Sequence, residues 1–213
     1  MTIAPPHLQW LNDPCQPSAD PARPACWVID MSRHPGLSAT VVRQVISMQL
    51  GMPGDAVELE TDALGRRILS PRTTRTIPRA LALDFSISHC PGTLVIGVCF
   101  GGRIGVDVEV DAPAGWEAAA RDCLTLAEQR WLQGTADAAA AFLSLWTAKE
   151  AIAKALGLGL QADFAGIELQ AREGCLHVLR VQHSESMAAG WTLDSMDLLT
   201  PAGRGIVTVG TVQ

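Results

Sequence analysis

Trp146-Thr-Ala-Lys-Glu-Ala-Ile-Ala-Lys-Ala-Leu-Gly157 contains both lysines of the chain. The sixteen cationic side chains are otherwise all arginines. An ammonium is a compact charge with a tunable proton, whereas a guanidinium stays protonated, so Lys149 and Lys154 indicate a site that needs an ammonium. The stretch falls in a helix predicted over 138–156 and ended by Gly157. An exposed helical ion pair between Glu150 and Lys154 is the alternative interpretation.

A second motif, Gly105-Val-Asp-Val-Glu-Val110, alternates apolar and acidic residues. As a strand it places Asp107 and Glu109 on one face and its valines on the other, because side chains alternate along a strand. Two adjacent carboxylates repel each other unless water or a cation lies between them. Mg2+ takes such carboxylates together with phosphate oxygens and water. A solvated acidic edge strand is the alternative.

In this order and spacing, the two motifs resemble the signature of the 4′-phosphopantetheinyl transferases of the surfactin-synthetase type. Two upstream elements add to the resemblance. Phe85-Ser-Ile-Ser-His89-Cys resembles the F-N-I-S-H-S element of that family, and Gly65-Arg-Arg resembles its G-K/R-P element, with Arg67 at the proline position. The resemblance extends over residues 41 to 160.

The resemblance implies an α+β fold of two similar lobes, related by a pseudo-twofold axis, each with a small antiparallel sheet and a long helix. The length of 213 residues suits this two-lobed, monomeric type rather than the shorter trimeric carrier-protein synthases. We expect residues 1–104 to form an N-terminal lobe with coenzyme A contacts. Residues 105–213 are expected to form a C-terminal lobe with the metal site and the catalytic helix.

Residue patterns predict the individual elements. An apolar stripe predicts a helix over 38–50, capped by Ser38. Strands are expected at 81–88 and 93–100, and a turn at Gly101-Gly102 then leads into the acidic strand to make an antiparallel meander. A capping box of Thr125 and Glu128 begins another helix. Further strands are expected within three segments, 164–181, 191–199 and 205–212.

By resemblance, the protein transfers the 4′-phosphopantetheine arm of coenzyme A to a serine of an apo acyl or peptidyl carrier protein. The resemblance implies that this reaction depends on Mg2+ and releases adenosine 3′,5′-bisphosphate. The resemblance assigns three metal ligands: Asp107, Glu109 and Glu150. It assigns three coenzyme A contacts, Arg66, Ser88 and His89, and we predict Lys149 as a fourth. Glu150 and Lys154 are the implied catalytic residues.

Some roles have two interpretations. Glu150 is a metal ligand or the general base for the serine hydroxyl. Glu128 joins the metal site in some family members, but the capping box explains it without a metal. Lys154 lies one turn beyond Glu150 and is predicted to assist the departing bisphosphate, by its charge or as a proton donor. Lys149 is turned aside by about 140° and is predicted to contact a coenzyme A phosphate at the cleft edge.

Composition limits the partners and the location. The net charge of −6 argues against a nucleic-acid partner, although segment 65–79 carries five arginines and no acidic residue. The six cysteines have no C-x-x-C spacing and are predicted to be reduced thiols. The chain has neither a signal-peptide pattern nor a run of about twenty apolar residues, so we expect a cytoplasmic protein without a membrane partner.

Two other function classes compete with the transferase. One is a coenzyme A-binding or carrier-protein-binding module without catalysis. The other is a Mg2+-dependent nucleotide phosphohydrolase, which would use the same metal site without a carrier protein.

Overall fold

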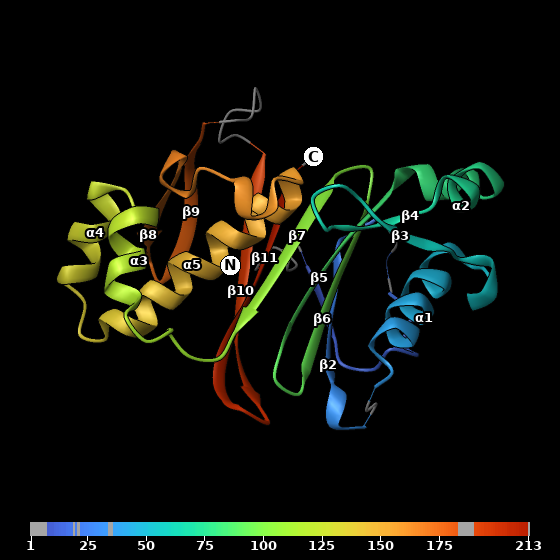
Figure 1. The fold of residues 1–213 in the computed structure, drawn as a ribbon, viewed down its shortest axis with the longest axis horizontal. Helices are drawn as coiled ribbons and strands as arrows, with labels where there is room; N and C mark the ends of the chain where they lie inside the picture. Colours follow the sequence, from blue (N-terminus) through green and yellow to red (C-terminus); the bar gives the residue numbers. More distant parts are fainter. Residues whose placement is uncertain (1–7, 19, 21, 34–35, 183–189, 213) are drawn as a thin grey trace, which may run out of the picture.

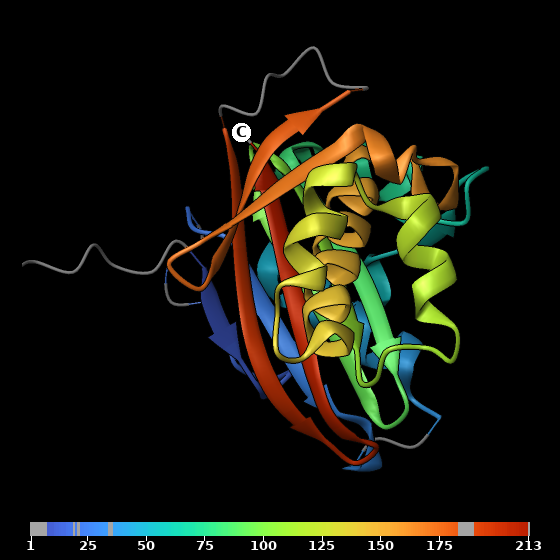
Figure 2. The ribbon, with the colours of Figure 1, turned by 90° about the vertical axis from the view of Figure 1, so that its left-hand side faces the viewer.

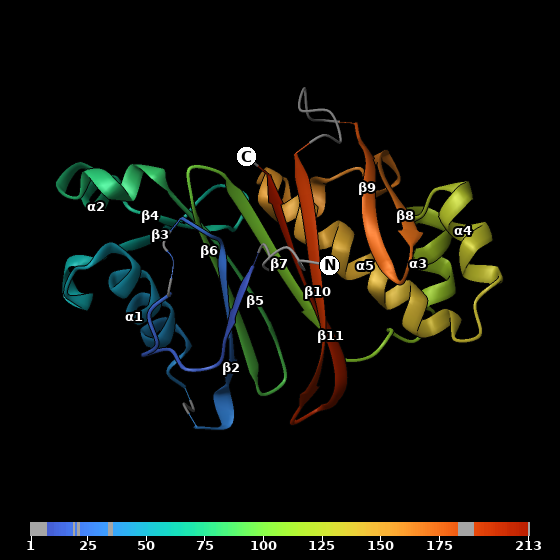
Figure 3. The ribbon, with the colours of Figure 1, turned by 180° about the vertical axis from the view of Figure 1, so that it is seen from behind.

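The computed structural model describes residues 8–18, 20, 22–33, 36–182 and 190–212. Two sheets lie side by side in the middle of the molecule, and helices flank them at both ends of the long axis (Figure 1 and Figure 3). Among the helices of these residues, none is both long enough and apolar enough to cross a membrane.

The first lobe is a four-stranded sheet in the order β1-β2-β6-β5. Its strands are β1 (Gln9–Leu11), β2 (Ala25–Asp30), β5 (Leu83–Cys90) and β6 (Thr93–Phe100). All pairs are antiparallel except β1 with β2. A small hairpin of β3 (Leu59–Thr61) and β4 (Arg67–Leu69) precedes helix α2 (Pro71–Thr76).

Helix α1 (Ser38–Leu50) covers one face of this sheet and buries Val41, Val45 and Ile46 in the core of the first lobe. These residues repeat every three to four positions, which explains why the sequence pattern predicted the helix. The predicted cap is wrong, because Leu37 occupies the N-cap position without a side-chain hydrogen bond and Ser38 is already helical.

The second lobe holds a three-stranded sheet in the order β10-β11-β7. Its strands are β7 (Arg103–Glu109), β10 (Trp191–Thr200) and β11 (Gly203–Val212). Helix α5 (Ala138–Leu156) lies across this sheet and contacts β7 and β11 (Figure 2). Outside α5 lie α3 (Trp116–Cys123), α4 (Leu126–Gln133) and the hairpin of β8 (Ile167–Arg172) and β9 (Cys175–Val181).

The two lobes repeat one topology. Each has a strand, a helix and then a hairpin, and the first strand pairs antiparallel with the second strand of the hairpin. In the first lobe these elements are β2, α1, β5 and β6; in the second they are β7, α5, β10 and β11. The expected fold of two similar α+β lobes is therefore confirmed.

The acidic strand β7 does not continue the predicted meander. It follows β6 in the chain but pairs with β11 of the second lobe. Strand β5 bonds to β7 through side chains instead. Asp84 accepts from the backbone amide of Ile104, and Ser86 accepts from that of Val106. One buried apolar cluster contains residues of both sheets, including Val95 and Val207, so the lobes share part of their core.

Candidate active site between the lobes

Helix α5 touches strand β7 at a glycine. A Cβ at Gly105 would lie 1.8 Å from the carbonyl oxygen of Ala151, so this approach requires a residue without a side chain. Asp107 is two residues further along β7 and therefore lies on the same face as Gly105. The close approach brings the last turns of α5, with Glu150 and Lys154, over this carboxylate.

Lys154, Asp107 and Ser88 form a hydrogen-bonded cluster that joins the lobes. Nζ of Lys154 lies 2.7 Å from Oδ1 of Asp107 and 3.1 Å from Oγ of Ser88. The Ser88 hydroxyl donates to the same Oδ1 at 2.9 Å. The Asp107 side chain is 5% exposed and that of Lys154 is 27% exposed. The Asp107 carboxylate of this cluster is thus buried, whereas the Lys154 side chain is partly accessible to solvent.

Two carboxyl groups near this cluster have raised pKa values. Burial raises the pKa of Glu150 to about 7, and the negative charge of Asp107 adds to the effect while Lys154 opposes it. Burial and then Asp107 also raise the pKa of Glu109. The three carboxylates therefore interact through their charges. A carboxyl group with a pKa near neutrality is suited to take up and release a proton.

The described residues contain no ready-made group of three or more histidine, cysteine or acidic side chains for a metal ion. The three predicted ligands are therefore not gathered into one complete ligand set. Asp107 nevertheless fits a cation, because its Oδ2 is buried and has no hydrogen-bond partner among the residues that the structure describes. A hard divalent cation would bind that oxygen and reduce the repulsion between the carboxylates of Asp107 and Glu150. One or two carboxylates suffice for Mg2+, which keeps several water or phosphate ligands.

A cavity of about 350 Å3 lies beside the cluster. Residues of both lobes line it, including Arg66, Ser86 and His89 of the first lobe and Lys154 of the second. Gly157, the left-handed C-cap of α5, forms part of the wall. The structure thus brings together five predicted site residues, because Arg66, His89 and Lys154 line the cavity and Lys154 also contacts Ser88 and Asp107.

Residues 103–194 match the family model of the 4′-phosphopantetheinyl transferase superfamily. The matched segment contains β7 and α5, and so the second-lobe half of the site. Residues 103–194 are therefore similar to this superfamily. The family resemblance of the sequence motifs is thereby confirmed.

Three curated relatives agree with this placement. The chain is 26% identical to an L-aminoadipate-semialdehyde dehydrogenase-phosphopantetheinyl transferase of Schizosaccharomyces pombe, over 64% of this chain and 57% of the relative. It is 26% identical to the 4′-phosphopantetheinyl transferase psf-1 of Bacillus pumilus, over 73% and 63%. It is 34% identical to a holo-[acyl-carrier-protein] synthase of Jannaschia, over 38% and 50%. The chain thus spans half to under two thirds of each relative.

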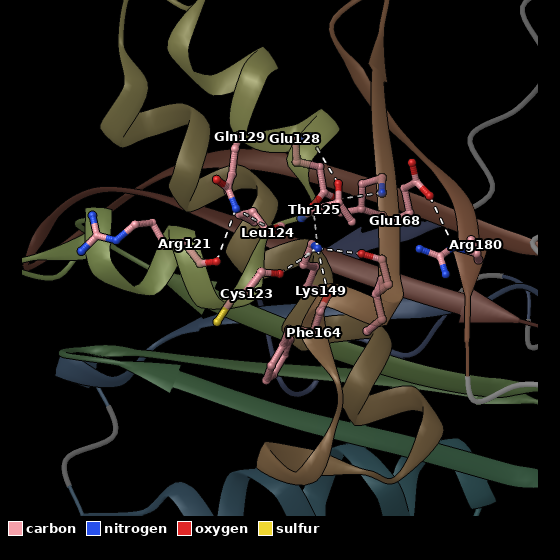
Figure 4. Close-up of polar contacts among 12 residues, drawn as sticks. Arg121, Cys123, Leu124, Thr125, Glu128, Gln129, Lys149, Phe164, Glu168 and Arg180 are labelled. Atoms are coloured by element: carbon pink, nitrogen blue, oxygen red, sulfur yellow. Dashed lines mark hydrogen bonds and ion pairs between the residues drawn. The ribbon is translucent and has the colours of Figure 1, made fainter.

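Lys149, which also lies in the matched segment, does not line this cavity. Its side chain is fully buried on the opposite side of α5, where Nζ donates to Oε2 of Glu128 at 2.7 Å (Figure 4). Three backbone carbonyls, those of Cys123, Phe164 and Ile167, accept from the same Nζ at 2.6 to 3.0 Å. This geometry contradicts the predicted phosphate contact, because the ammonium is saturated by protein oxygens and closed to solvent.

Glu128 is the buried centre of this second cluster. The capping box is confirmed, since Thr125 accepts from the Glu128 amide and the Glu128 carboxylate accepts from the Thr125 amide. The same carboxylate accepts from the amide of Leu169 at 2.8 Å. Together with Lys149, these bonds attach α4 and β8 to α5. Glu128 is thus engaged by protein donors away from Asp107, which favours the capping interpretation over a metal ligand.

Arg66 lines the cavity, but its guanidinium is already engaged. Its two terminal nitrogens donate to Asp84 and to the carbonyl oxygens of Phe85, Ile104 and Lys154. His89 is exposed at the end of β5 and lines the same cavity. His89 is therefore accessible to a ligand, whereas the Arg66 guanidinium already donates its hydrogen bonds to protein acceptors.

Sequence reasoning missed the roles of Asp84 and Ser86. Both lie on β5 with Ser88, at alternate positions of the strand, and all three bond to β7. The signal was the polar period of two within 83–90, which indicates a strand face that meets polar groups rather than a core.

Proposed function

We propose that this protein transfers the 4′-phosphopantetheine arm of coenzyme A to a serine hydroxyl of an apo carrier protein. The observation that carries the proposal is the meeting of Lys154, Asp107 and Ser88 beside a cavity of about 350 Å3 between the lobes. Phosphoryl transfer chiefly requires positioning and neutralisation of charge. The Lys154 ammonium could bind pyrophosphate oxygens, and the buried Oδ2 of Asp107, which has no hydrogen-bond partner among the described residues, could bind the accompanying Mg2+.

Asp107 and Glu150 would hold the Mg2+ ion, with Glu109 as a further ligand or a ligand through water. The bound ion would neutralise charge on the pyrophosphate oxygens. Lys154 adds a positive charge next to the departing adenosine 3′,5′-bisphosphate. Ser88 and His89 are proposed to contact phosphate oxygens from the first-lobe side of the cavity.

In the transfer step, the carrier serine oxygen forms a bond to the β-phosphorus of coenzyme A. The bond from that phosphorus to the bridging oxygen breaks, and its electron pair leaves with the bisphosphate beside the Lys154 ammonium. The serine proton passes to Glu150, directly or through water. Burial and the charge of Asp107 raise the pKa of Glu150 in the protein without metal, and a Mg2+ ion beside Asp107 would lower it again and keep this carboxylate ionised, so that it could accept the proton.

The decisive experiment incubates the protein with apo carrier protein, coenzyme A and Mg2+, followed by mass spectrometry of the carrier. We expect the carrier to gain one phosphopantetheine arm. A phosphohydrolase would instead cleave coenzyme A at the same rate without the carrier and leave the carrier mass unchanged. A binding module would alter neither molecule. Both outcomes would exclude the proposed transfer.

Asp107→Asn tests the assignment of the site. The change keeps the size of the side chain but removes its charge, and we expect a loss of at least about 100-fold in transfer rate, as for other deleted electrostatic groups. Asp111→Asn is the matched control, because Asp111 is exposed just beyond β7. Equal rates for the two variants at saturating Mg2+ would refute the assignment.

Further parts of the proposal concern the setting of the reaction. We propose acyl or peptidyl carrier proteins as partners, a monomeric enzyme and a cytoplasmic location. The division into lobes at 104 and 105 also remains a proposal; it falls near the start of β7.

A further inference from the structure

Side chains of one strand hold the two lobes together. Strands β5 and β7 are edge strands of their respective sheets and lie side by side. Oδ2 of Asp84 accepts from the amide of Ile104 at 2.8 Å, and Oγ of Ser86 accepts from the amide of Val106 at 3.1 Å. Ser88 completes the row with its bond to Asp107. Because alternate residues of a strand face one way, β5 presents a continuous polar seam to β7.

Arg66 extends this seam to helix α5. One terminal nitrogen donates to Oδ1 of Asp84 at 2.8 Å and to the Phe85 carbonyl oxygen at 2.9 Å, both on β5. It also lies 3.4 Å from the carbonyl oxygen of Ile104 on β7. The other terminal nitrogen donates to the carbonyl oxygen of Lys154. One guanidinium therefore connects β5, β7 and the end of α5.

The bond to Lys154 lies at the point where α5 ends. The same carbonyl oxygen accepts from the amide of Gly157 at 3.1 Å, in the turn that closes the helix. Arg66 therefore contacts the backbone of the residue whose ammonium faces Asp107. The distance from the Lys154 ammonium to Ser88 of the first lobe, 3.1 Å, depends on where this last turn lies relative to that lobe.

The engagement of Arg66 argues against a primary role as a phosphate ligand. Its side chain is 15% exposed, and Asp84 neutralises its charge at 2.8 Å. A phosphate would have to compete with that carboxylate and with several carbonyl oxygens. The planar fork of arginine suits several fixed acceptors at once, whereas a lysine would offer a single ammonium.

We propose that Arg66 and Asp84 form an interlobe clasp that positions Lys154 for transfer, so that Arg66 is a positioning residue rather than a nucleotide ligand. The inference rests on the proposed function, because it concerns the same site. Loss of the clasp frees the last turn of α5 to move relative to β5. Since a displacement of about 1 Å can cost roughly 100-fold in rate, the clasp acts on turnover more than on coenzyme A affinity.

The test compares Arg66→Gln, Arg66→Lys and Asp84→Asn for turnover and for calorimetric binding of coenzyme A. We expect kcat to fall by roughly 10- to 100-fold in each, while the dissociation constant changes by less than about threefold. Arg66→Lys should not restore the rate. The control is Arg72→Gln, which removes a solvent-exposed ion pair with Glu58 and should leave both quantities unchanged.

Two outcomes would overturn the clasp. A weaker binding of coenzyme A with normal kcat at saturation would make Arg66 a nucleotide ligand. Normal values of both quantities would make it dispensable.

A double-mutant cycle in urea separates failure of the clasp from failure of the proposed function. If the wild-type protein transfers nothing, the transferase proposal fails, but the denaturation midpoints of Arg66→Gln, Asp84→Asn and the double variant still report on the clasp. We expect the two changes to be non-additive, because each removes the same bond. Additive midpoint shifts would refute the clasp whatever the activity.

Discussion

Gly105→Ala should separate helix α5 from strand β7. The backbone at Gly105 does not have a positive φ, and alanine is intrinsically better than glycine inside a strand by about 0.5 to 1 kcal/mol. Local propensity alone therefore predicts a neutral or stabilising change. The tertiary contact reverses this sign, because the new Cβ would lie 1.8 Å from the Ala151 carbonyl oxygen and 2.6 Å from the Ala155 amide nitrogen.

The size of the effect follows from these distances. A carbon atom normally stays about 3.3 Å or more from a carbonyl oxygen, so α5 and β7 must separate by roughly 1.5 Å. Overpacking of this kind costs about 1 to 3 kcal/mol, occasionally more. The clashing atoms belong to the backbone of α5, which cannot relieve the contact by a change of rotamer as a side chain can. For a chain of this length, 3 kcal/mol corresponds to a decrease in Tm of about 6 to 12 °C. A shift of this size at Lys154 should also lower the transfer rate by about 100-fold.

Thermal and urea denaturation measure the stability, and the carrier assay measures the rate. Gly54→Ala is the matched control, because the nearest heavy atom to its new Cβ is Oγ of Ser47 at 3.8 Å, and its φ is not positive. We expect this control to stay within about 0.5 kcal/mol of wild type. A Gly105→Ala protein with wild-type Tm and wild-type rate would refute the argument that a close helix–strand contact builds the site.

The remaining predictions concern the buried charges. Lys149→Met should lower the free energy of unfolding by about 3 to 5 kcal/mol, because it leaves the Glu128 carboxylate buried without its cation; adding Glu128→Gln should recover part of the loss, and a fully stable single variant would contradict the buried ion pair. In metal-free buffer, Glu150→Gln should flatten the pH dependence of stability. The pKa of Glu150 is raised from 4.5 to about 7 in the folded protein, so the native state binds more protons between these values and loses about 3 kcal/mol of stability as the pH rises from 4.5 to about 7. Urea denaturation at pH 5 and pH 8 checks this. The same change in unfolding free energy between these two pH values in the variant and the wild type would disprove it.

Much of the architecture could be predicted from local patterns. The helices at 38–50 and 138–156 and the strand that carries Asp107 appeared as periodicities of apolar residues, since burial on one face imposes a period near 3.6 or 2. The capping box of Thr125 and Glu128 was also visible, because it satisfies amides within a single turn. These features depend on residues close together in the chain.

Side-chain partners far apart in sequence could not be predicted in this way. Helical geometry predicted that Lys149 and Lys154 point in different directions, but not that α3, α4 and the segment from Phe164 to Ile167 would surround Lys149 with four oxygen acceptors. The motif at Gly65 suggested a ligand contact for Arg66, yet the fold brings Asp84 and the end of α5 to its guanidinium.

The sequence by itself thus determined the elements, the two-lobed class and the residue types that gather at Asp107. Only the tertiary structure decided that Lys149 is fully buried in an ion pair and that Arg66 joins the lobes. The physical reason is that periodicity records whether a face is buried, whereas the fate of a charge depends on the acceptors that distant segments bring within about 3 Å of it.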